Sequence, residues 1–140
     1  MGIGNKKLND YAKDLIEIAK QGLKNRAVKD SAGNDFELGS LHEDGDARLL
    51  LISTGAGWGS ACIEEQPLLE QWSTQYKDKG LRVIMTVFED GSSQAADVAY
   101  ANTWKGEYNL SIPVLADTDA QFGAYYNSDL APMNMIVEAC

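Results

Sequence analysis

Residues that could do chemistry are concentrated in one loop, residues 54–62, where a glycine-rich stretch ends in Cys62. The loop reads Thr-Gly-Ala-Gly-Trp-Gly-Ser-Ala-Cys and follows an apolar run. Sites of open α/β sheets gather at the carboxyl ends of strands, so we look for a site here. The glycines match neither phosphate-binding pattern, G-x-x-x-x-G-K-[ST] or G-x-G-x-x-G. The candidate is therefore the thiol of Cys62, although a lone cysteine is by itself more often a buried structural residue.

The other metal-binding and thiol-bearing residues are too few and too far apart for a second site. His42 is the single histidine, and 77 residues separate Cys62 from Cys140. The closely paired ligands of a zinc site are absent, so we expect no metal and no cofactor. A Cys62–Cys140 disulfide within one chain is disfavoured, because the extended residues after Pro132 span about 26 Å and disulfide Cα atoms lie about 4.4–6.8 Å apart.

The elements that must position the loop alternate between strands and helices. Residues 6–21 predict an amphipathic helix, because apolar side chains recur there at three- and four-residue spacing. Residues 26–38 predict a small hairpin at one edge of a sheet. The next expected elements are a central parallel strand at 48–53, a helix at 60–79 kinked by Pro67, a strand at 81–88, a helix at 94–105, a strand at 112–115, a helix at 119–127 and a strand at 133–137. The helix at 60–79 is expected to bury Ile63, Leu68, Leu69, Trp72 and Tyr76.

Length and charge bound the classes of protein and partner. The chain has 140 residues, 44% of them hydrophobic, which suits one domain with its own core. We expect an amphipathic helix over residues 1–23 and a domain over residues 24–140. The net charge of −9 argues against nucleic acid as a partner. The sequence shows neither an apolar run long enough to span a membrane nor a signal peptide.

The loop and the elements around it together resemble the thioredoxin-like redoxins of the TlpA and alkyl hydroperoxide reductase type. In that family an apolar strand leads to Trp-Cys-x-x-Cys, then an acid, a helical proline, an L-R-V-I strand, a helical insertion, an x-P-V-L-x-D segment and a cis-proline strand. The matching places here are Trp58, Cys62, Glu65, Pro67, 81–87, 113–117 and Pro132. The resemblance covers residues 24–138 and implies a thioredoxin-like α/β fold, with a central mixed sheet flanked by helices.

The sequence departs from the family pattern at Gly59, where the family has its attacking cysteine. The resemblance implies that this first thiol attacks a disulfide and that the second, here Cys62, resolves the mixed disulfide. Loss of the side chain at Gly59 is expected to open Cys62 to solvent. The helix end would lower the pKa of Cys62 and burial would raise it, and both directions stay open. Ser53 occupies the position of the buried acid that thioredoxins use for proton transfer to the second thiol, so another group must transfer that proton here.

The resemblance also implies which residues hold a partner, namely a protein disulfide or thiol. Pro132 matches the cis-proline, and Ala131 before it would pair its backbone with an extended peptide. Trp58 would form an apolar floor on which the partner lies. Ser60 and Ala61 would line the same surface.

Three accounts of Gly59 are open. Either the glycine was introduced or arose in a working Cys-x-x-Cys protein, which leaves an impaired thiol-disulfide oxidoreductase. Or Cys62 acts alone as a peroxidase, as in the Thr-x-x-Cys site of peroxiredoxins, although none of Arg26, Arg48 and Arg82 is evidently placed for the arginine of such a site. Or the domain binds a partner without redox chemistry.

Location and assembly follow from the resemblance as well. It implies the bacterial periplasm or cell envelope, although the sequence shows no leader or anchor, so a cytoplasmic location stays open. Family members continue beyond the cis-proline strand, whereas this chain stops at Cys140, as a truncated form or an unusual natural end. A truncated form would leave an exposed edge strand, and two chains could pair through it or through Cys140.

Overall fold

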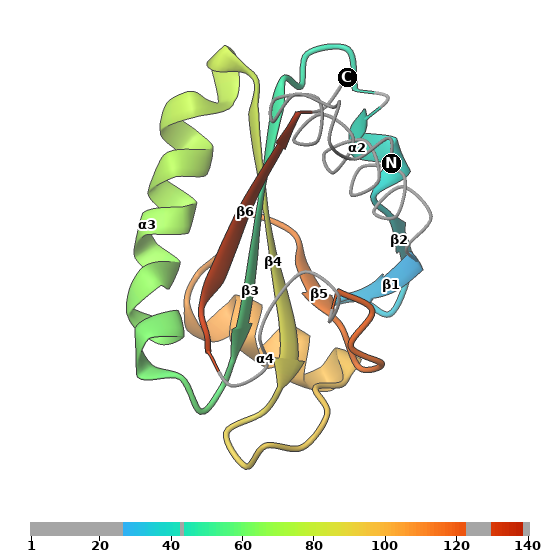
Figure 1. The fold of residues 1–140 in the computed structure, drawn as a ribbon, viewed down its shortest axis with the longest axis vertical. Coiled ribbons are helices and arrows are strands. Elements are labelled where there is room, and N and C mark those ends of the chain that lie inside the picture. Colours follow the sequence, from blue (N-terminus) through green and yellow to red (C-terminus); the bar gives the residue numbers. More distant parts are fainter. Residues whose placement is uncertain (1–26, 43, 123–129, 139–140) are drawn as a thin grey trace, which may run out of the picture.

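A computed structural model describes residues 27–42, 44–122 and 130–138, which form one mixed sheet with helices on its faces (Figure 1). The strands lie in the order β2-β1-β5-β4-β3-β6. Their bounds are β1 Ala27–Asp30, β2 Asp35–Glu37, β3 Leu49–Ala56, β4 Leu81–Glu89, β5 Val114–Ala116 and β6 Met133–Glu138. The helices are α2 Gly39–His42, α3 Ser60–Tyr76, the short 3-10 helix η2 Lys77–Lys79 and α4 Val98–Glu107.

The strand pairing is parallel in the middle of the sheet and antiparallel towards both edges. β4 pairs in parallel with β3 and with β5, whereas β6 is antiparallel to β3 and β1 is antiparallel to β5. The expected hairpin is confirmed as β1 and β2, at one edge. β3 is parallel to β4 as predicted, but it is not central, because only β6 lies beyond it among the described strands.

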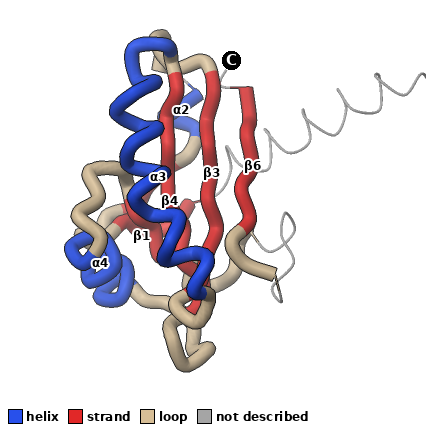
Figure 2. The backbone as a smooth tube through the Cα atoms, turned by 90° about the vertical axis from the view of Figure 1, so that its left-hand side faces the viewer, coloured by secondary structure: helices blue, strands red, loops and turns tan. Residues whose placement is uncertain are grey.

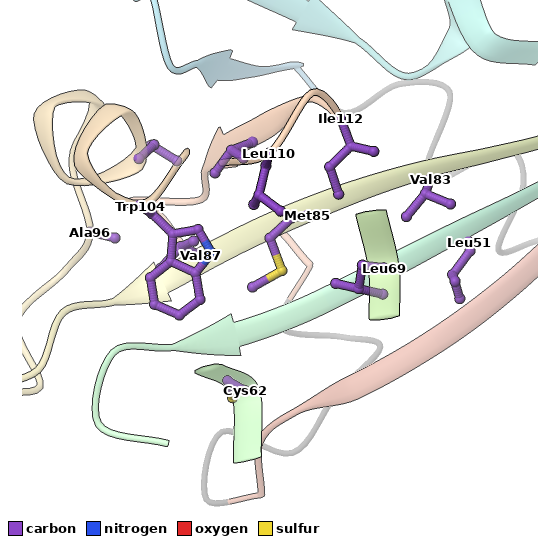
Figure 3. Packing of buried hydrophobic residues seen from close by; sticks show 13 residues of the cluster. Leu51, Cys62, Leu69, Val83, Met85, Val87, Ala96, Trp104, Leu110 and Ile112 are labelled. Atoms are coloured by element: carbon purple, nitrogen blue, oxygen red, sulfur yellow. The ribbon is translucent and has the colours of Figure 1, made fainter. Parts of the chain in front are cut away.

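The core has two layers because successive side chains of a strand point to opposite faces. Leu51 of β3 and Met85 of β4 belong to the layer under α3 and α4, which Figures 2 and 3 show on the same face of the sheet. Leu50 and Ile52 point to the other face, where Leu38 closes the layer beside α2. A strand covered on both faces reads as a continuous apolar run, which explains why β3 is recognisable in the sequence.

Several element boundaries differ from the prediction. α4 begins at Val98 rather than at residue 94, because the side chain of Asp97 accepts a hydrogen bond from the backbone N–H of Tyr100 and caps the helix there. α2 was not predicted. Residues 119–122 form turns, and the rest of the helix expected at 119–127 lies outside the described residues. The helix expected at 6–21 and Cys140 also lie outside them.

The buried face of α3 matches the prediction in part. Leu69 is fully buried, and Ile63 and Trp72 pack against the core cluster. Leu68 and Tyr76 are instead 45% and 37% exposed, whereas Cys62 and Gln66 are fully buried. The helix continues through Pro67. No helix within the described residues is both long and apolar enough to cross a lipid bilayer.

Candidate active site

The loop between β3 and α3 is rich in glycine because its surroundings leave no room for side chains. A Cβ atom at Gly55 would lie 2.9 Å from Cε of Met85. One at Gly57 would lie 2.0 Å from the hydroxyl of Tyr100 and 2.7 Å from the backbone nitrogen of Gly91. Gly55, near the end of β3, therefore packs closely against Met85 of β4, and Gly57 packs against Tyr100 and the segment after β4, so no phosphate is needed to explain either glycine.

At Gly59 the close neighbour is a single side-chain atom of Cys62, and the backbone, like those of Gly55 and Gly57, does not require glycine. It is the N-cap residue of α3, with φ −91° and ψ 104°, an extended conformation open to any residue. The nearest atom to a Cβ built here is Sγ of Cys62, at 2.8 Å, and the Cβ of Cys62 is 3.7 Å away. Position 59 thus faces the cysteine directly.

Cys62 lies in the first turn of α3, and its side chain is fully buried. The expectation that the missing side chain at Gly59 opens the thiol to solvent is wrong. Burial is the main cause that raises the pKa of Cys62, and the negative charge of Glu65 adds to it, while a backbone hydrogen bond with Ala56 acts in the opposite direction. The thiol is therefore protonated at neutral pH. Because its pKa is raised above that of the unfolded chain, this thiol stabilises the fold below about pH 8.5, and that stability is lost as the pH rises.

We expect native Cys62 to react slowly with small electrophiles. In a Cys140→Ser background, which leaves Cys62 as the single thiol, alkylation at pH 7 should be at least ~100-fold slower than that of a cysteine peptide, because both burial and protonation oppose it. The rate should rise with pH and reach the peptide rate in denaturant. Mass spectrometry of timed iodoacetamide reactions measures this, and a native rate equal to that of the peptide would contradict the buried position.

Trp58 is part of the loop between β3 and α3, and contacts with two residues of β4 fix its indole in place. Its Nε1 donates a hydrogen bond of 2.7 Å to Oε2 of Glu89, at the end of β4. Its ring meets that of Phe88 edge-on, with centroids 6.3 Å apart. The indole is 37% exposed, so a rigid aromatic surface borders the loop.

The start of β6 approaches the first turns of α3. The peptide bond between Ala131 and Pro132 is cis, as the resemblance predicted. Ala131 packs against the core cluster that contains Cys62. Two residues beyond the proline, Nδ2 of Asn134 donates a hydrogen bond to Oε1 of Glu65 on α3. The structure therefore brings the cysteine loop and the cis-proline segment to the same end of the sheet, where Figure 1 shows the end of β3 and the starts of α3 and β6.

One buried polar residue beside Cys62 escaped the sequence analysis. Gln66 accepts a 3.0 Å hydrogen bond from Nε1 of Trp104 on α4 and donates one of 2.7 Å to the backbone carbonyl of Cys62. The sequence feature that could have identified Gln66 is its position one helical turn after Cys62. Replacing it with an apolar residue would leave Trp104 without a partner, which costs about 1–3 kcal/mol. Gln66 thus ties the cysteine-bearing turn to α4.

A sequence model of the family described as Redoxin matches residues 12–137. The chain belongs to the Redoxin family. Curated relatives of this redoxin include the thiol-disulfide oxidoreductases ResA of Bacillus anthracis and of Bacillus thuringiensis strain Al Hakam. Each is 24% identical over 126 residues, which cover 90% of this chain and 66% of the relative. The chain thus spans about two thirds of the length of these relatives.

Solved structures confirm the thioredoxin-like fold. Hypothetical protein SMc02350 of Sinorhizobium meliloti 1021 has a TM-score of 0.67 at 18% identity, over 81% of this redoxin and 61% of that chain. A secreted Mycobacterium tuberculosis disulfide oxidoreductase homologous to E. coli DsbE has a TM-score of 0.62 at 20% identity, over 84% of each chain. Xanthomonas campestris peroxiredoxin Q has a TM-score of 0.61 at 12% identity, over 85% of this redoxin and 77% of that chain. Because disulfide oxidoreductases and a peroxiredoxin share this fold, the choice between their chemistries depends on the site.

Proposed function

We propose that this redoxin carries the partner-binding surface and the resolving thiol of a thiol-disulfide oxidoreductase, with Gly59 in place of the attacking cysteine. The observation that carries the proposal is the geometry at position 59. A Cβ there would lie 3.7 Å from the Cβ of Cys62, inside the range of about 3.5–4.5 Å found across disulfides. The two positions are therefore arranged as a disulfide pair of which one thiol is missing.

The surroundings support a protein partner with an extended, cysteine-containing segment. Ser60 and Ala61 are exposed at the start of α3, and Trp58 borders them with its fixed indole. Ala131 and Pro132 are half-buried at the start of β6. A strand-like segment lying across these residues would place its sulfur over position 59.

With a single thiol the chain cannot complete disulfide reduction. Two thiols supply the two electrons that a partner disulfide takes up, and they end as a disulfide themselves. Cys62 alone stops at a mixed disulfide, and its burial hinders even that step. We therefore propose that the unaltered domain binds its partner and is impaired in turnover.

The peroxidase alternative fits the structure less well. Peroxide attack needs an accessible thiolate, whereas Cys62 is buried and the pKa of its thiol is raised. Arg48 and Arg82 lie near the amino ends of β3 and β4, about 25 Å along the strands from their carboxyl ends, where the loop starts. Arg82 is bound there to Asp44. A sulfenic-acid probe should therefore leave Cys62 unlabelled after peroxide treatment.

The proposal is tested by Gly59→Cys in a Cys140→Ser background. Mild oxidation should close a disulfide between positions 59 and 62, which lowers the mass by two hydrogens and removes both thiols from alkylation under denaturing conditions. Gly45→Cys is the matched control, because a Cβ at Gly45 has no atom within 4 Å. This control should keep its thiols. A Gly59→Cys variant that also keeps two free thiols would overturn the paired geometry.

We also propose a location in the bacterial cell envelope. The support is the secreted Mycobacterium tuberculosis oxidoreductase among the structures with this fold. Fractionation of the native host cells, with the domain detected by antibody, tests this point.

A further inference from the structure

A polar niche lies between α3 and the sheet, beside Cys62, and the exchange chemistry proposed above leaves it without a role. Oε2 of Glu65 and Oγ of Ser53 are both buried, and neither has a hydrogen-bond partner among the described residues. Ser53 and Asn134 are directly opposed in the pairing of β3 with β6, so their side chains lie on the same face of the sheet. That face carries α3, because Leu51, two residues before Ser53, packs in the cluster with Leu69 of α3.

The carboxylate of Glu65 is held in this niche from one side. Nδ2 of Asn134 donates a hydrogen bond to Oε1 of Glu65 and so joins α3 to β6 across 69 positions of sequence. A carboxylate with one oxygen out of contact with water is unfavourable unless a donor holds it. Cys62 and Glu65 are three residues apart on α3 and therefore lie on the same face of the helix.

We propose that Asn134 is a positioning residue: its amide keeps the Glu65 carboxylate turned inward between α3 and the sheet, on the side of Cys62. Held there, the negative charge opposes formation of the thiolate and so adds to the effect of burial on the resolving thiol. The charge of Glu65 raises the pKa of Cys62, as this placement requires, although burial raises it more and the backbone hydrogen bond with Ala56, which lowers it, also has a larger effect. Without the amide, the side chain of Glu65 turns to solvent and its effect on the thiol weakens.

The other described neighbours of Cys62 carry no charge. Gly55 on β3 has no side chain, and the side chains of Met85 on β4, Trp104 on α4 and Ala131 before β6 are uncharged. Glu89, at the end of β4, is bound to the indole of Trp58. Glu65 is therefore the charged group whose placement decides the electrostatic environment of the thiol, and Asn134 decides the placement.

The experiment is a pH titration of Cys62 in a Cys140→Ser background, followed by the ultraviolet absorbance of the thiolate, with circular dichroism to confirm folding. Asn134→Leu should lower the pKa of Cys62 by about 0.5, and Glu65→Gln should lower it at least as much. The double variant should match Glu65→Gln alone, because the amide acts only through the carboxylate. Asn134→Gln, which retains an amide, should restore most of the original pKa.

Glu64→Gln is the matched control, because it removes the same charge from an exposed neighbour on α3. It should change the pKa of Cys62 by less than Asn134→Leu does, although Asn134 carries no charge. The proposal is overturned if Asn134→Leu leaves the titration unchanged, or if the double variant adds the two effects. The role of Asn134 depends on the proposed function only in one respect, namely what a protonated Cys62 does in the exchange cycle. The titration reads the thiol of the unaltered Gly59 chain, so its outcome is independent of whether Gly59→Cys closes a disulfide.

Discussion

Gly59→Cys is expected to give this redoxin catalytic turnover, with a rate of disulfide reduction at least ~100-fold above that of the unaltered chain. The new thiol would stand at the start of α3, where the helix end and its free N–H groups stabilise a thiolate. That thiolate attacks one sulfur of the partner disulfide, the S–S bond breaks, and the other partner sulfur leaves as a thiolate that takes up a proton. Cys62 then attacks the mixed disulfide, releases the second partner thiol and closes the 59–62 bridge. A dithiol reductant returns both electrons and both protons to the pair.

The measurement is the reduction of a small aromatic disulfide, with dithiothreitol as the source of electrons. Incubated with the aromatic disulfide in the absence of dithiothreitol, Gly59→Cys/Cys62→Ser should attack once, release one aromatic thiol and remain as a mixed disulfide that mass spectrometry detects. Gly59→Ser should match the unaltered chain. If the variant with both cysteines turns over no faster than the one with Cys62→Ser, disulfide exchange is not the chemistry for which the site is arranged.

Gly57→Ala is expected to destabilise the fold by about 3 kcal/mol. The added methyl group would overlap the hydroxyl of Tyr100 at 2.0 Å and backbone atoms of Gly91 and Asp90 at 2.7 and 2.9 Å. The tyrosine side chain can move aside, but the backbone of the segment after β4 cannot do so without losing its own hydrogen bonds. Gly57→Ala/Tyr100→Phe should therefore recover only part of the loss.

Urea unfolding, followed by circular dichroism, measures this effect. Gly106→Ala is the matched control, because a Cβ at this helical position of α4 meets no atom within 4 Å. It should stabilise the fold by about 0.5–1 kcal/mol, since alanine is the better helix former. Equal stability of Gly57→Ala and the unaltered chain would mean that the loop does not pack as described.

The fold was largely predictable because two of its interior strands are covered on both faces. β3 and β4 stand out as continuous apolar runs, and the hairpin of β1 and β2 has a turn-rich centre at residues 30–34. The start of α4 was missed because Asp97 caps the helix three residues after the expected start at residue 94. Caps of this kind depend on the backbone conformation of one residue, which a hydrophobic pattern does not specify.

The inner face of α3 was assigned only in part, for a different reason. Gln66 follows two glutamates, so the segment looks solvated, and Leu68 looks like the better core residue. Gln66 is buried because Trp104, 38 residues further on, supplies its hydrogen bond. Long-range polar pairing of this kind leaves no periodic signal in the sequence.

The members of the candidate site were expected from the order of motifs, but not their contacts. Trp58, Cys62 and the cis bond before Pro132 follow from the resemblance. The hydrogen bond of Trp58 to Glu89 and that of Asn134 to Glu65 join residues 31 and 69 positions apart. The pKa of Cys62 is raised mainly by burial, which only the packed structure reveals.

The ordinary backbone at Gly59 has a consequence for how this domain changes over evolutionary time. A residue held in a left-handed turn is fixed by the fold, whereas the extended conformation here accepts glycine and cysteine alike. Codons for these two amino acids differ by one nucleotide. A change between glycine and cysteine at position 59 is therefore a minimal mutational step that the backbone conformation allows. Under the proposed function, selection for redox activity decides which of the two residues a lineage keeps.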